Sequence, residues 1–371
     1  MGRPGATEMK RGVPIERIEV SAYTIPTDAP ESDGTLEWHA TTLVLVQASA
    51  GDVTGIGFSY ANRATATLIA DTLTSVTQGR DALDIAGAWS AMVAAIRNLG
   101  RPGISSMAIA AVDNALWDLK ARLLDLPLVR LLGASRDAIP VYGSGGFTSY
   151  TIEHLQKQLG GWAQAGIRMV KMKIGREPSD DIARVQAARE AIGADTALFV
   201  DANGAYTRKQ ALGFANAFVD CGVTWFEEPV PSDDLEGLRL IRDRGPAPID
   251  ITSGEYGYDL VYFRRMCEAG AVDVLQADAT RCAGITGFVR AATVARSFHL
   301  PLSSHCAPSI HAHPCCAVDA VHLEYFHDHV RIERMLFDGA LEPVDGKLVP
   351  ANDRPGFGLA FKAADARKYQ I

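Results

Sequence analysis

The sequence lacks the features that mark secreted and membrane-spanning proteins. No apolar run approaches the roughly 18 residues that a transmembrane helix needs, and residues 1–14 contain no apolar stretch of the length found in a secretory signal. The six cysteines show no CxxC spacing, so we interpret them as reduced thiols rather than disulfide partners. These absences predict a cytoplasmic location and no contact with a membrane.

An excess of positive charge is also missing. The chain carries 36 Lys and Arg against 44 Asp and Glu, a formal charge of −8, and it shows no basic stripe. This balance argues against a nucleic-acid partner, which would have to be held through its phosphates. The hydrophobic content of 47% and the charged content of 22% are those of an ordinary globular enzyme.

The first 138 residues predict an α+β unit in which strands are followed by helices. A polar loop at residues 26–35 separates the first two strands. Ser105 is the expected N-cap of the last and longest helix. The expected elements are strands at 15–25 and 42–47 and helices near 64–78, 85–95 and 105–124.

From Ile139 short β-rich runs alternate with helical stretches. Eight such runs, most of them separated by a helix, predict a parallel α/β barrel over residues 139–336. A doubly wound open sheet is the alternative, but no glycine-rich phosphate loop follows the first strand. Residues 337–371 are typical of a return segment that packs on the first unit. The predicted strands are 139–142, 169–174, 198–200, 224–226, 249–252, 272–276, 300–303 and 318–323.

Two lysines lie on one predicted barrel strand. Lys171 and Lys173 are two residues apart, so their side chains face the same way. A strand of a parallel barrel is covered on both faces, and its apolar residues should face the helices. Both ammonium groups would then lie in the barrel mouth, where each is expected to lower the other's pKa from the usual ~10.4. A lysine with a lowered pKa can act as a general base.

Three carboxylates end the next three predicted strands: Asp201, Glu227 and Glu255. The C-terminal ends of barrel strands converge on one pocket, and three carboxylates there cannot all stay ionised without a cation. A ligand set made only of oxygens favours Mg²⁺ or Mn²⁺ over zinc. Asn203 follows Asp201 by two residues and is expected to face the same pocket.

Acid–base groups are expected on the remaining strands. Asp278 and His305 end consecutive strands, and an aspartate beside a histidine raises the histidine pKa and fixes its tautomer. Glu324, at the last strand, would donate a hydrogen bond to developing negative charge if its pKa is raised.

Two histidine pairs allow a different hypothesis. His311 with His313, and His327 with His329, resemble zinc-ligand pairs of a metallohydrolase. Barrel hydrolases of that kind usually place their HxH pair on the first strand, whereas these pairs follow the seventh and eighth. A barrel that binds ligands without catalysis is a further alternative, although every expected catalytic group is present.

The motifs together resemble the enolase superfamily, in the mandelate racemase subgroup. The resemblance covers nearly the whole chain, and the motifs occur in order at compatible spacing. They are Val170-Lys171-Met172-Lys173-Ile174-Gly175, Val200-Asp201-Ala202-Asn203-Gly204, Trp225-Phe226-Glu227-Glu228-Pro229, Ser253-Gly254-Glu255, Gln276-Ala277-Asp278, Ser303-Ser304-His305 and His322-Leu323-Glu324.

The resemblance implies a modified (β/α)7β TIM-type barrel, an N-terminal α+β capping domain and one essential Mg²⁺ per subunit. It also implies removal of the proton α to a substrate carboxylate, with an enediolate intermediate. Lys173 would be the base on one face, and His305, partnered by Asp278, the base or acid on the other. Lys171 would neutralise the small-molecule carboxylate, and Glu324 would hydrogen-bond to it. A homo-oligomer is also expected.

Fold and motifs fix only this half-reaction, because the subgroup contains dehydratases, racemases, epimerases and cycloisomerases. We favour dehydration of a sugar acid, with a racemase, an epimerase or a cycloisomerase as the alternative. The loop at residues 26–35 carries Asp28, Glu31 and Asp33, which would accept hydrogen bonds from a polyol and repel a distal carboxylate. We therefore expect this loop to close over the barrel mouth and to prefer a monoacid sugar.

Overall fold

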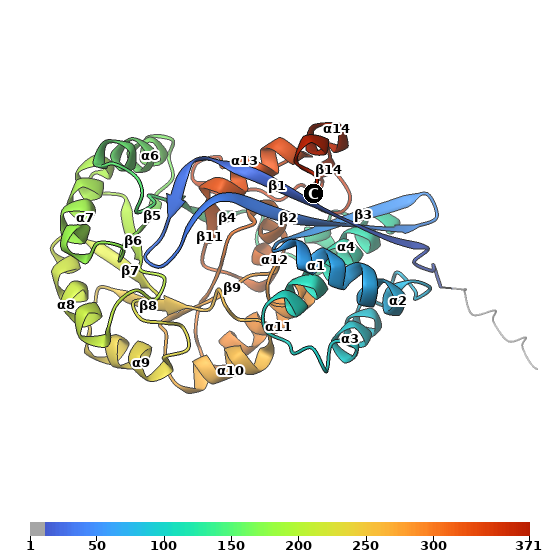
Figure 1. The fold of residues 1–371 in the computed structure, drawn as a ribbon, viewed down its shortest axis with the longest axis horizontal. Coiled ribbons are helices and arrows are strands. Elements are labelled where there is room, and N and C mark those ends of the chain that lie inside the picture. Colours follow the sequence, from blue (N-terminus) through green and yellow to red (C-terminus); the bar gives the residue numbers. More distant parts are fainter. Residues whose placement is uncertain (1–11) are drawn as a thin grey trace, which may run out of the picture.

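The computed structural model describes residues 12–371, which form an antiparallel sheet with helices beside a closed parallel barrel (Figure 1). The sheet pairs its three strands in chain order, and the long β1–β2 hairpin extends across the barrel. Its elements are β1 (Arg17–Ser32), β2 (Glu37–Ala50), β3 (Val53–Tyr60), α1 (Arg63–Leu68), the π-helical turn η1 (Ile69–Leu73), α2 (Thr74–Thr77), α3 (Ile85–Ala95), α4 (Ile104–Leu123) and α5 (Leu128–Leu132).

Eight parallel strands pair in chain order, and the last pairs with the first, so the barrel closes. A helix follows each strand and covers its outer face (Figure 1). The strands are β4 (Ile139–Gly145), β5 (Met169–Lys173), β6 (Ala197–Asp201), β7 (Val223–Glu227), β8 (Asp250–Ser253), β9 (Val274–Ala277), β10 (Leu302–Ser304) and β11 (Leu323–Phe326). The helices are α6 (Ile152–Gln164), α7 (Pro178–Ile192), α8 (Arg208–Val219), α9 (Leu235–Arg244), α10 (Leu260–Glu268), α11 (Gly284–Ser297), α12 (Pro308–Val318) and α13 (His327–Leu336).

The predicted fold class, a TIM-type barrel with an N-terminal α+β unit, is confirmed, but three local predictions are wrong. The last strand begins at Leu323 rather than at 318, because α12 continues to Val318 and ends at Asp319 in the left-handed conformation. Ser105 lies inside α4, whose N-cap is Gly103. Residues 26–32 are not a loop but the end of β1, so the turn is confined to residues 33–36.

The C-terminal segment contacts both the barrel and the sheet. Its short strands are β12 (Phe337–Asp338), β13 (Lys347–Leu348) and β14 (Ala360–Phe361), followed by α14 (Ala363–Ala366) and the 3-10 turn η2 (Arg367–Tyr369). Strand β13 pairs with β4 of the barrel, and the backbone N–H of Ile371 donates to the Ala22 carbonyl of β1 at 3.0 Å. In the described residues no helix is long and apolar enough to cross a bilayer.

Asp118 of α4 joins these parts through one buried carboxylate. It accepts hydrogen bonds from the backbone N–H of Ile56 in β3 at 2.8 Å and of Phe357 in the C-terminal segment at 2.6 Å. Arg122, one turn along α4, donates from Nε at 2.6 Å. Burial raises the pKa of Asp118, and these partners oppose that shift.

Replacing Asp118 with alanine would leave two buried N–H groups without acceptors. We expect Asp118→Ala to lower the free energy of unfolding by about 3 kcal/mol or more, because each buried unsatisfied donor costs about 1–3 kcal/mol. Urea unfolding followed by circular dichroism measures this. Asp353→Ala, at an exposed aspartate, is the control and should change stability by no more than about 0.5 kcal/mol. Equal effects of the two substitutions would contradict this role.

Candidate active site

A cavity of about 440 Å³ lies at the C-terminal ends of the barrel strands. One side is formed by barrel residues and the other by residues of the capping sheet, among them Trp38, Thr41 and Asn62. The predicted site residues that line it are Asp33, Lys173, Asn203, Glu255, Asp278, His305 and Glu324. Lys171, Asp201 and Glu227 are fully buried beneath it.

Strand register brings the charged groups together. Lys173, Asp201 and Glu227 are the final residues of β5, β6 and β7, and they are direct partners across the two ladders. Glu255 comes two residues after β8, beyond Gly254, whose φ is 138°. A Cβ at position 254 would lie 2.1 Å from the Gln276 carbonyl oxygen, so only glycine allows the chain to turn there.

Both lysines are held by carboxylates. The Nζ of Lys171 lies 2.8 Å from both carboxylate oxygens of Glu227 and 2.9 Å from Glu324 Oε1. The Nζ of Lys173 lies 2.5 Å from Asp201 Oδ2 and 3.1 Å from Asn203 Oδ1.

The lysine pKa shifts have the opposite sign to the predicted one. Burial lowers the pKa of both Lys171 and Lys173, but neighbouring carboxylates outweigh it, chiefly Glu227 for Lys171 and Asp201 for Lys173. Both pKa values therefore lie above the usual range. The prediction that two ammonium groups lower each other's pKa is wrong for this arrangement, because each lysine has more carboxylates than ammonium groups beside it.

The three predicted metal ligands converge and fit a divalent cation. Asp201, Glu227 and Glu255 each offer an oxygen within 4.8 Å of the others, and all three are buried. Oε2 of Glu255 is buried and accepts no hydrogen bond. Burial and then the charge of Asp201 raise the pKa of Glu227 to about 7, which reports an excess of negative charge. Since all donors are oxygens, the set suits Mg²⁺.

His305 and Asp278 form a hydrogen-bonded pair. Nδ1 of His305 lies 2.8 Å from Asp278 Oδ2, while the other oxygen of Asp278 accepts from Thr280 N at 2.6 Å. Burial lowers the pKa of His305, but Glu255 first and then other groups raise it above its usual value. Burial raises the pKa of Asp278, and the bond to His305 more than reverses that effect. The imidazole is therefore favoured in its protonated form.

Glu324 is ionised in this structure, contrary to the predicted donor role. It accepts hydrogen bonds from Ser144 Oγ at 2.6 Å and from Cys306 N at 2.9 Å, besides its contact with Lys171. Burial raises the pKa of Glu324, but Lys171 and then His305 bring it well below the usual value. An ionised Glu324 accepts hydrogen bonds only.

The three carboxylates of the capping hairpin do not form one group: Asp28 and Glu31 lie near each other and His327, and Asp33 is not part of that group. Oδ1 of Asp33 faces its own turn and accepts from Thr35 N at 2.6 Å and from Leu36 N at 2.7 Å. Asp28 and Glu31 do not line the cavity. Asp28 Oδ2 lies 3.0 Å from His327 Nε2, and the buried Glu31 accepts from Trp38 Nε1 at 2.8 Å.

Arg281 is a cavity residue that the sequence reasoning missed. Its Nη1 lies 3.1 Å from Glu255 Oε1, and its Nε lies 3.8 Å from Asp278 Oδ2. Its guanidinium also lies over the ring of Tyr256. Its position three residues after Asp278 could have indicated it, because such neighbours share one side of a helical turn.

The histidine pair of α12, His311 and His313, serves a structural role. His311 Nε2 accepts from Ala279 N at 2.7 Å, and its Nδ1 lies 2.7 Å from the Cys306 carbonyl oxygen. Burial lowers the pKa of His313 to about 4. Among residues 12–371, neither His311 nor His313 belongs to a group of side chains that could hold a metal ion, whereas His327 forms such a group with Asp28 and Glu31 of the capping hairpin. That group does not line the barrel-mouth cavity, and the pair on α12 gives the metallohydrolase alternative no support.

Removing one oxygen ligand tests the metal site. We expect Glu255→Gln to weaken Mg²⁺ binding by at least about 10-fold, since even changes outside the ligand shell cost about 10–100-fold. Isothermal titration calorimetry with MgCl₂ measures the affinity. Glu333→Gln is the matched control, because Glu333 is buried in α13 outside this cavity. Equal affinities for the two variants would refute the assignment.

The raised pKa of Glu31 predicts that the stability of the protein depends on pH. Burial and then the charge of Asp328 raise its pKa from an ordinary 4.5 to about 8. The folded state holds this proton more tightly than the unfolded state does, so the stabilisation is complete below about pH 4.5 and disappears as the pH rises through about 8.

Glu31→Gln removes this titration and keeps an acceptor for Trp38. Relative to the wild type, the variant should gain in Tm as the pH rises from 5 to 9, measured by differential scanning calorimetry. Glu236→Gln, at an exposed glutamate, should show no such trend. A Tm difference between Glu31→Gln and the wild type that is independent of pH would contradict the shift.

Comparisons with known proteins agree with this geometry. Residues 19–133 match the family described as mandelate racemase / muconate lactonizing enzyme, N-terminal domain, and residues 154–366 match the one described as enolase C-terminal domain-like. The 3,6-anhydro-alpha-L-galactonate cycloisomerase of Streptomyces coelicolor is 32% identical over 94% of this chain and 97% of its own. The L-talarate/galactarate dehydratase of Salmonella typhimurium is 31% identical over 98% of this chain and 93% of its own.

Solved structures extend the similarity to the whole fold. A mandelate racemase/muconate lactonizing enzyme-like protein from Rubrobacter xylanophilus has a TM-score of 0.95 and 56% identity, covering 96% of this chain and 100% of that one. A racemase from Streptomyces coelicolor A3(2) with bound magnesium has a TM-score of 0.90 and 29% identity, covering 96% and 100%. The resemblance inferred from the motifs is confirmed: the chain is an enzyme that belongs to the mandelate racemase/muconate lactonizing enzyme family of the enolase superfamily.

Proposed function

We propose that this enzyme dehydrates a sugar acid by removing the proton α to its carboxylate in a Mg²⁺-dependent reaction. The observation that carries the proposal is the placement of two acid–base groups on one cavity. Lys173 comes from β5 and His305 from β10, and the strands β4 and β11 lie between them. Beside them, Asp201, Glu227 and Glu255 present the oxygen set suited to the cation. When bound, Mg²⁺ supplies charge stabilisation for the substrate carboxylate.

Lys173 would take the α proton. It must first be neutral, and Asp201 at 2.5 Å stabilises its ammonium form. If Asp201 held Mg²⁺, the ion would share its negative charge, and Asp201 would stabilise the ammonium form of Lys173 less strongly. Lys171, which keeps Glu324 at 2.9 Å, would remain charged and neutralise the substrate carboxylate.

His305 would act as the acid. Asp278 holds Nδ1 at 2.8 Å, so Nε2 is left to face the cavity and to protonate the β-hydroxyl as it leaves as water. The sign of the His305 pKa shift agrees with this role, because the protonated form is favoured. Glu324, as an acceptor, would orient this end of the cavity through Cys306 N and Ser144 Oγ.

The polar residues on the capping side of the cavity favour a polyol substrate, and they do not select between a monoacid and a diacid sugar. The polar residues Thr41, Thr42 and Asn62 are among those that line the cavity. Of the three hairpin carboxylates only Asp33 lines it, and Oδ1 of Asp33 is bonded within its own turn, so the expected repulsion of a second carboxylate loses two of its three sources. The relative that is named a talarate/galactarate dehydratase supports a diacid, and one named an arabinonate dehydratase, at 29% identity over 76% of this chain, supports a monoacid.

Cycloisomerisation of a sugar-acid derivative is the second candidate. It rests on the cycloisomerase of Streptomyces coelicolor, which is as similar to this chain as the dehydratase is. Mass spectrometry separates the two reactions, because a dehydration product is lighter by one water and a cycloisomerisation product has the mass of its substrate.

The boundaries of the three predicted units, a homo-oligomeric state and a cytoplasmic location stay predictions.

The two-base assignment predicts the behaviour of single variants. With a library of mono- and diacid sugars and Mg²⁺ in deuterium oxide, we expect the wild type to release water from at least one acid. On that substrate, Lys173→Met and His305→Asn should each lower kcat by about 10²–10⁴-fold, the contribution of a positioned acid or base. His39→Asn, at an exposed histidine, should keep wild-type kcat.

Deuterium exchange separates the two roles. Lys173→Met should lose exchange of the α proton with solvent, and His305→Asn should retain it while losing release of water. Near-normal turnover by both variants would refute the assignment of bases. Turnover that persists after treatment with EDTA would refute the dependence on Mg²⁺.

A further inference from the structure

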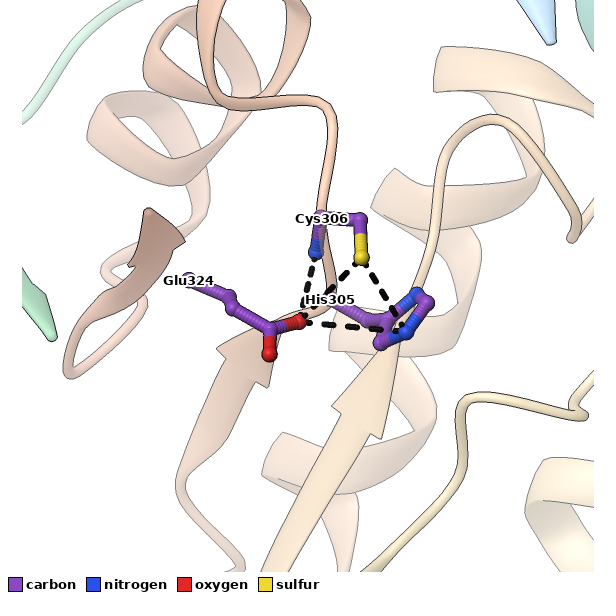
Figure 2. A group of neighbouring side chains, drawn as sticks. All are labelled: His305, Cys306 and Glu324. Atoms are coloured by element: carbon purple, nitrogen blue, oxygen red, sulfur yellow. Dashed lines mark hydrogen bonds and ion pairs between the residues drawn. The ribbon is translucent and has the colours of Figure 1, made fainter. Parts of the chain in front are cut away.

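Cys306 is a buried thiol at the cavity that the proposed reaction does not use. Its Sγ lies 3.2 Å from His305 Nε2 and 3.4 Å from Glu324 Oε2, and these two atoms are 3.8 Å apart. The three side chains point toward one another at the ends of β10 and β11 (Figure 2). They form a group of potential metal ligands separate from Asp201, Glu227 and Glu255.

The triangle of donor atoms has the size of a tetrahedral metal face. Zn–S distances of about 2.3 Å and Zn–N and Zn–O distances of about 2.0–2.2 Å give ligand–ligand edges of roughly 3.3–3.6 Å at tetrahedral angles. The observed edges of 3.2, 3.4 and 3.8 Å bracket these values. A cation therefore needs shifts of only a few tenths of an ångström, and its fourth position would face the cavity.

The surroundings of these atoms are those of a built metal site. Metal-binding histidines usually donate their second ring N–H to a carboxylate, which directs the other nitrogen at the ion. His305 has this partner in Asp278, at 2.8 Å from Nδ1. Ser144 Oγ and the backbone N–H of Cys306 fix the two oxygens of Glu324 at 2.6 and 2.9 Å.

We propose that His305, Cys306 and Glu324 form a second metal site, selective for a thiophilic cation such as Zn²⁺, and that its occupation inhibits the enzyme. Nitrogen, sulfur and oxygen donors select Zn²⁺, whereas the all-oxygen set selects Mg²⁺. On binding, the S–H bond of Cys306 and the Nε2–H bond of the protonated His305 break, Zn–S and Zn–N bonds form, and both protons leave to solvent, with no change of oxidation state. The bound ion would block His305 Nε2, the atom that acts as the acid in the proposed dehydration. The inhibition therefore rests on the proposed function, whereas the binding of the ion does not.

Cobalt provides a direct readout of the thiolate ligand. The full-length protein, kept in saturating Mg²⁺, is titrated with CoCl₂ and followed by absorption spectroscopy. We expect one equivalent of Co²⁺ to bind with a thiolate-to-cobalt charge-transfer band in the ultraviolet. Cys306→Ser should lose the band and bind Co²⁺ more weakly by more than the roughly 10–100-fold cost of an outer-shell change. Cys267→Ser, at a buried cysteine of α10, should keep the band.

Two results would overturn the site: no charge-transfer band in the wild type, or a band that survives in Cys306→Ser. If Cys306→Ser does not fold, His305→Asn serves instead, and unchanged Co²⁺ affinity in that variant overturns the site as well.

Inhibition is tested separately with ZnCl₂, and the rate of each protein is compared with its own rate before ZnCl₂ is added. Cys306→Ser should need at least about 10-fold more Zn²⁺ than the wild type, and equal sensitivity would place the inhibition at the magnesium ligands. An absence of dehydratase activity would refute the proposed function while leaving the cobalt result intact.

Discussion

The contacts of Lys171 are the interaction on which the barrel mouth depends. This ammonium group is fully buried and lies within 2.9 Å of both Glu227 and Glu324, and 3.3 Å from Asp201. Without it, three carboxylates would share a volume from which water is excluded, and their mutual repulsion would favour protonation. With it, Glu324 is ionised and Asp201 and Glu227 stay close enough to share a cation. The charge of Lys171 therefore lowers the pKa of carboxylates on β6, β7 and β11. It is the largest lowering influence on Glu324, whereas Lys173 contributes more at Asp201, and burial with the charge of Asp201 outweighs it at Glu227.

An excess of carboxylates over ammonium groups accounts for both proposed metal sites, the all-oxygen set and the set that contains Cys306. Lys171 and Lys173 leave one oxygen of the buried Glu255 without a hydrogen bond, and that oxygen belongs to the set suited to Mg²⁺. Beside this set, His305 lies between Glu255 and Glu324, at 3.3 and 3.8 Å. A thiol beside His305 adds a soft donor to one half of the mouth only. Hence the types of donor atom, rather than the size of the cavity, determine which set binds Mg²⁺ and which binds Zn²⁺.

The positions of the charged groups were predictable from the sequence, but their protonation states were not. Lys173, Asp201 and Glu227 end consecutive parallel strands, and in-register pairing makes them neighbours whatever the details of packing. The pKa of Lys173 depends instead on counting every charge around it, including residues from distant strands. Burial and then Lys171 lower the pKa of Lys173, but carboxylates at the ends of three other strands raise it by more, and a pair of lysines on one strand does not reveal those carboxylates.

The capping hairpin was misjudged for a related reason. The pattern of polar residues along the hairpin does not reveal which carboxylate faces the cavity. The direction of each side chain depends on its tertiary partner: Glu31 contacts Trp38, and Asp28 contacts His327 in α13. The last strand was misplaced because the apolar residues around Val318 suit a helix end as well as a strand. Arg281 was overlooked because a single arginine has no periodic signal.

The hairpin nevertheless links closure of the cavity to the geometry of the catalytic strands. A Cβ on Gly34 would lie 2.4 Å from the Ala202 carbonyl oxygen and 2.8 Å from that of Ile174. Those two residues directly follow Asp201 and Lys173, so the turn at 33–36 contacts the backbone that carries a proposed metal ligand and the proposed base. Because the contact is made with backbone atoms at close range, the hairpin can approach only when both strand ends hold their observed conformation. The position of the hairpin tip over the cavity and the conformation of these two strand ends therefore depend on each other, and a glycine at the tip permits their close contact.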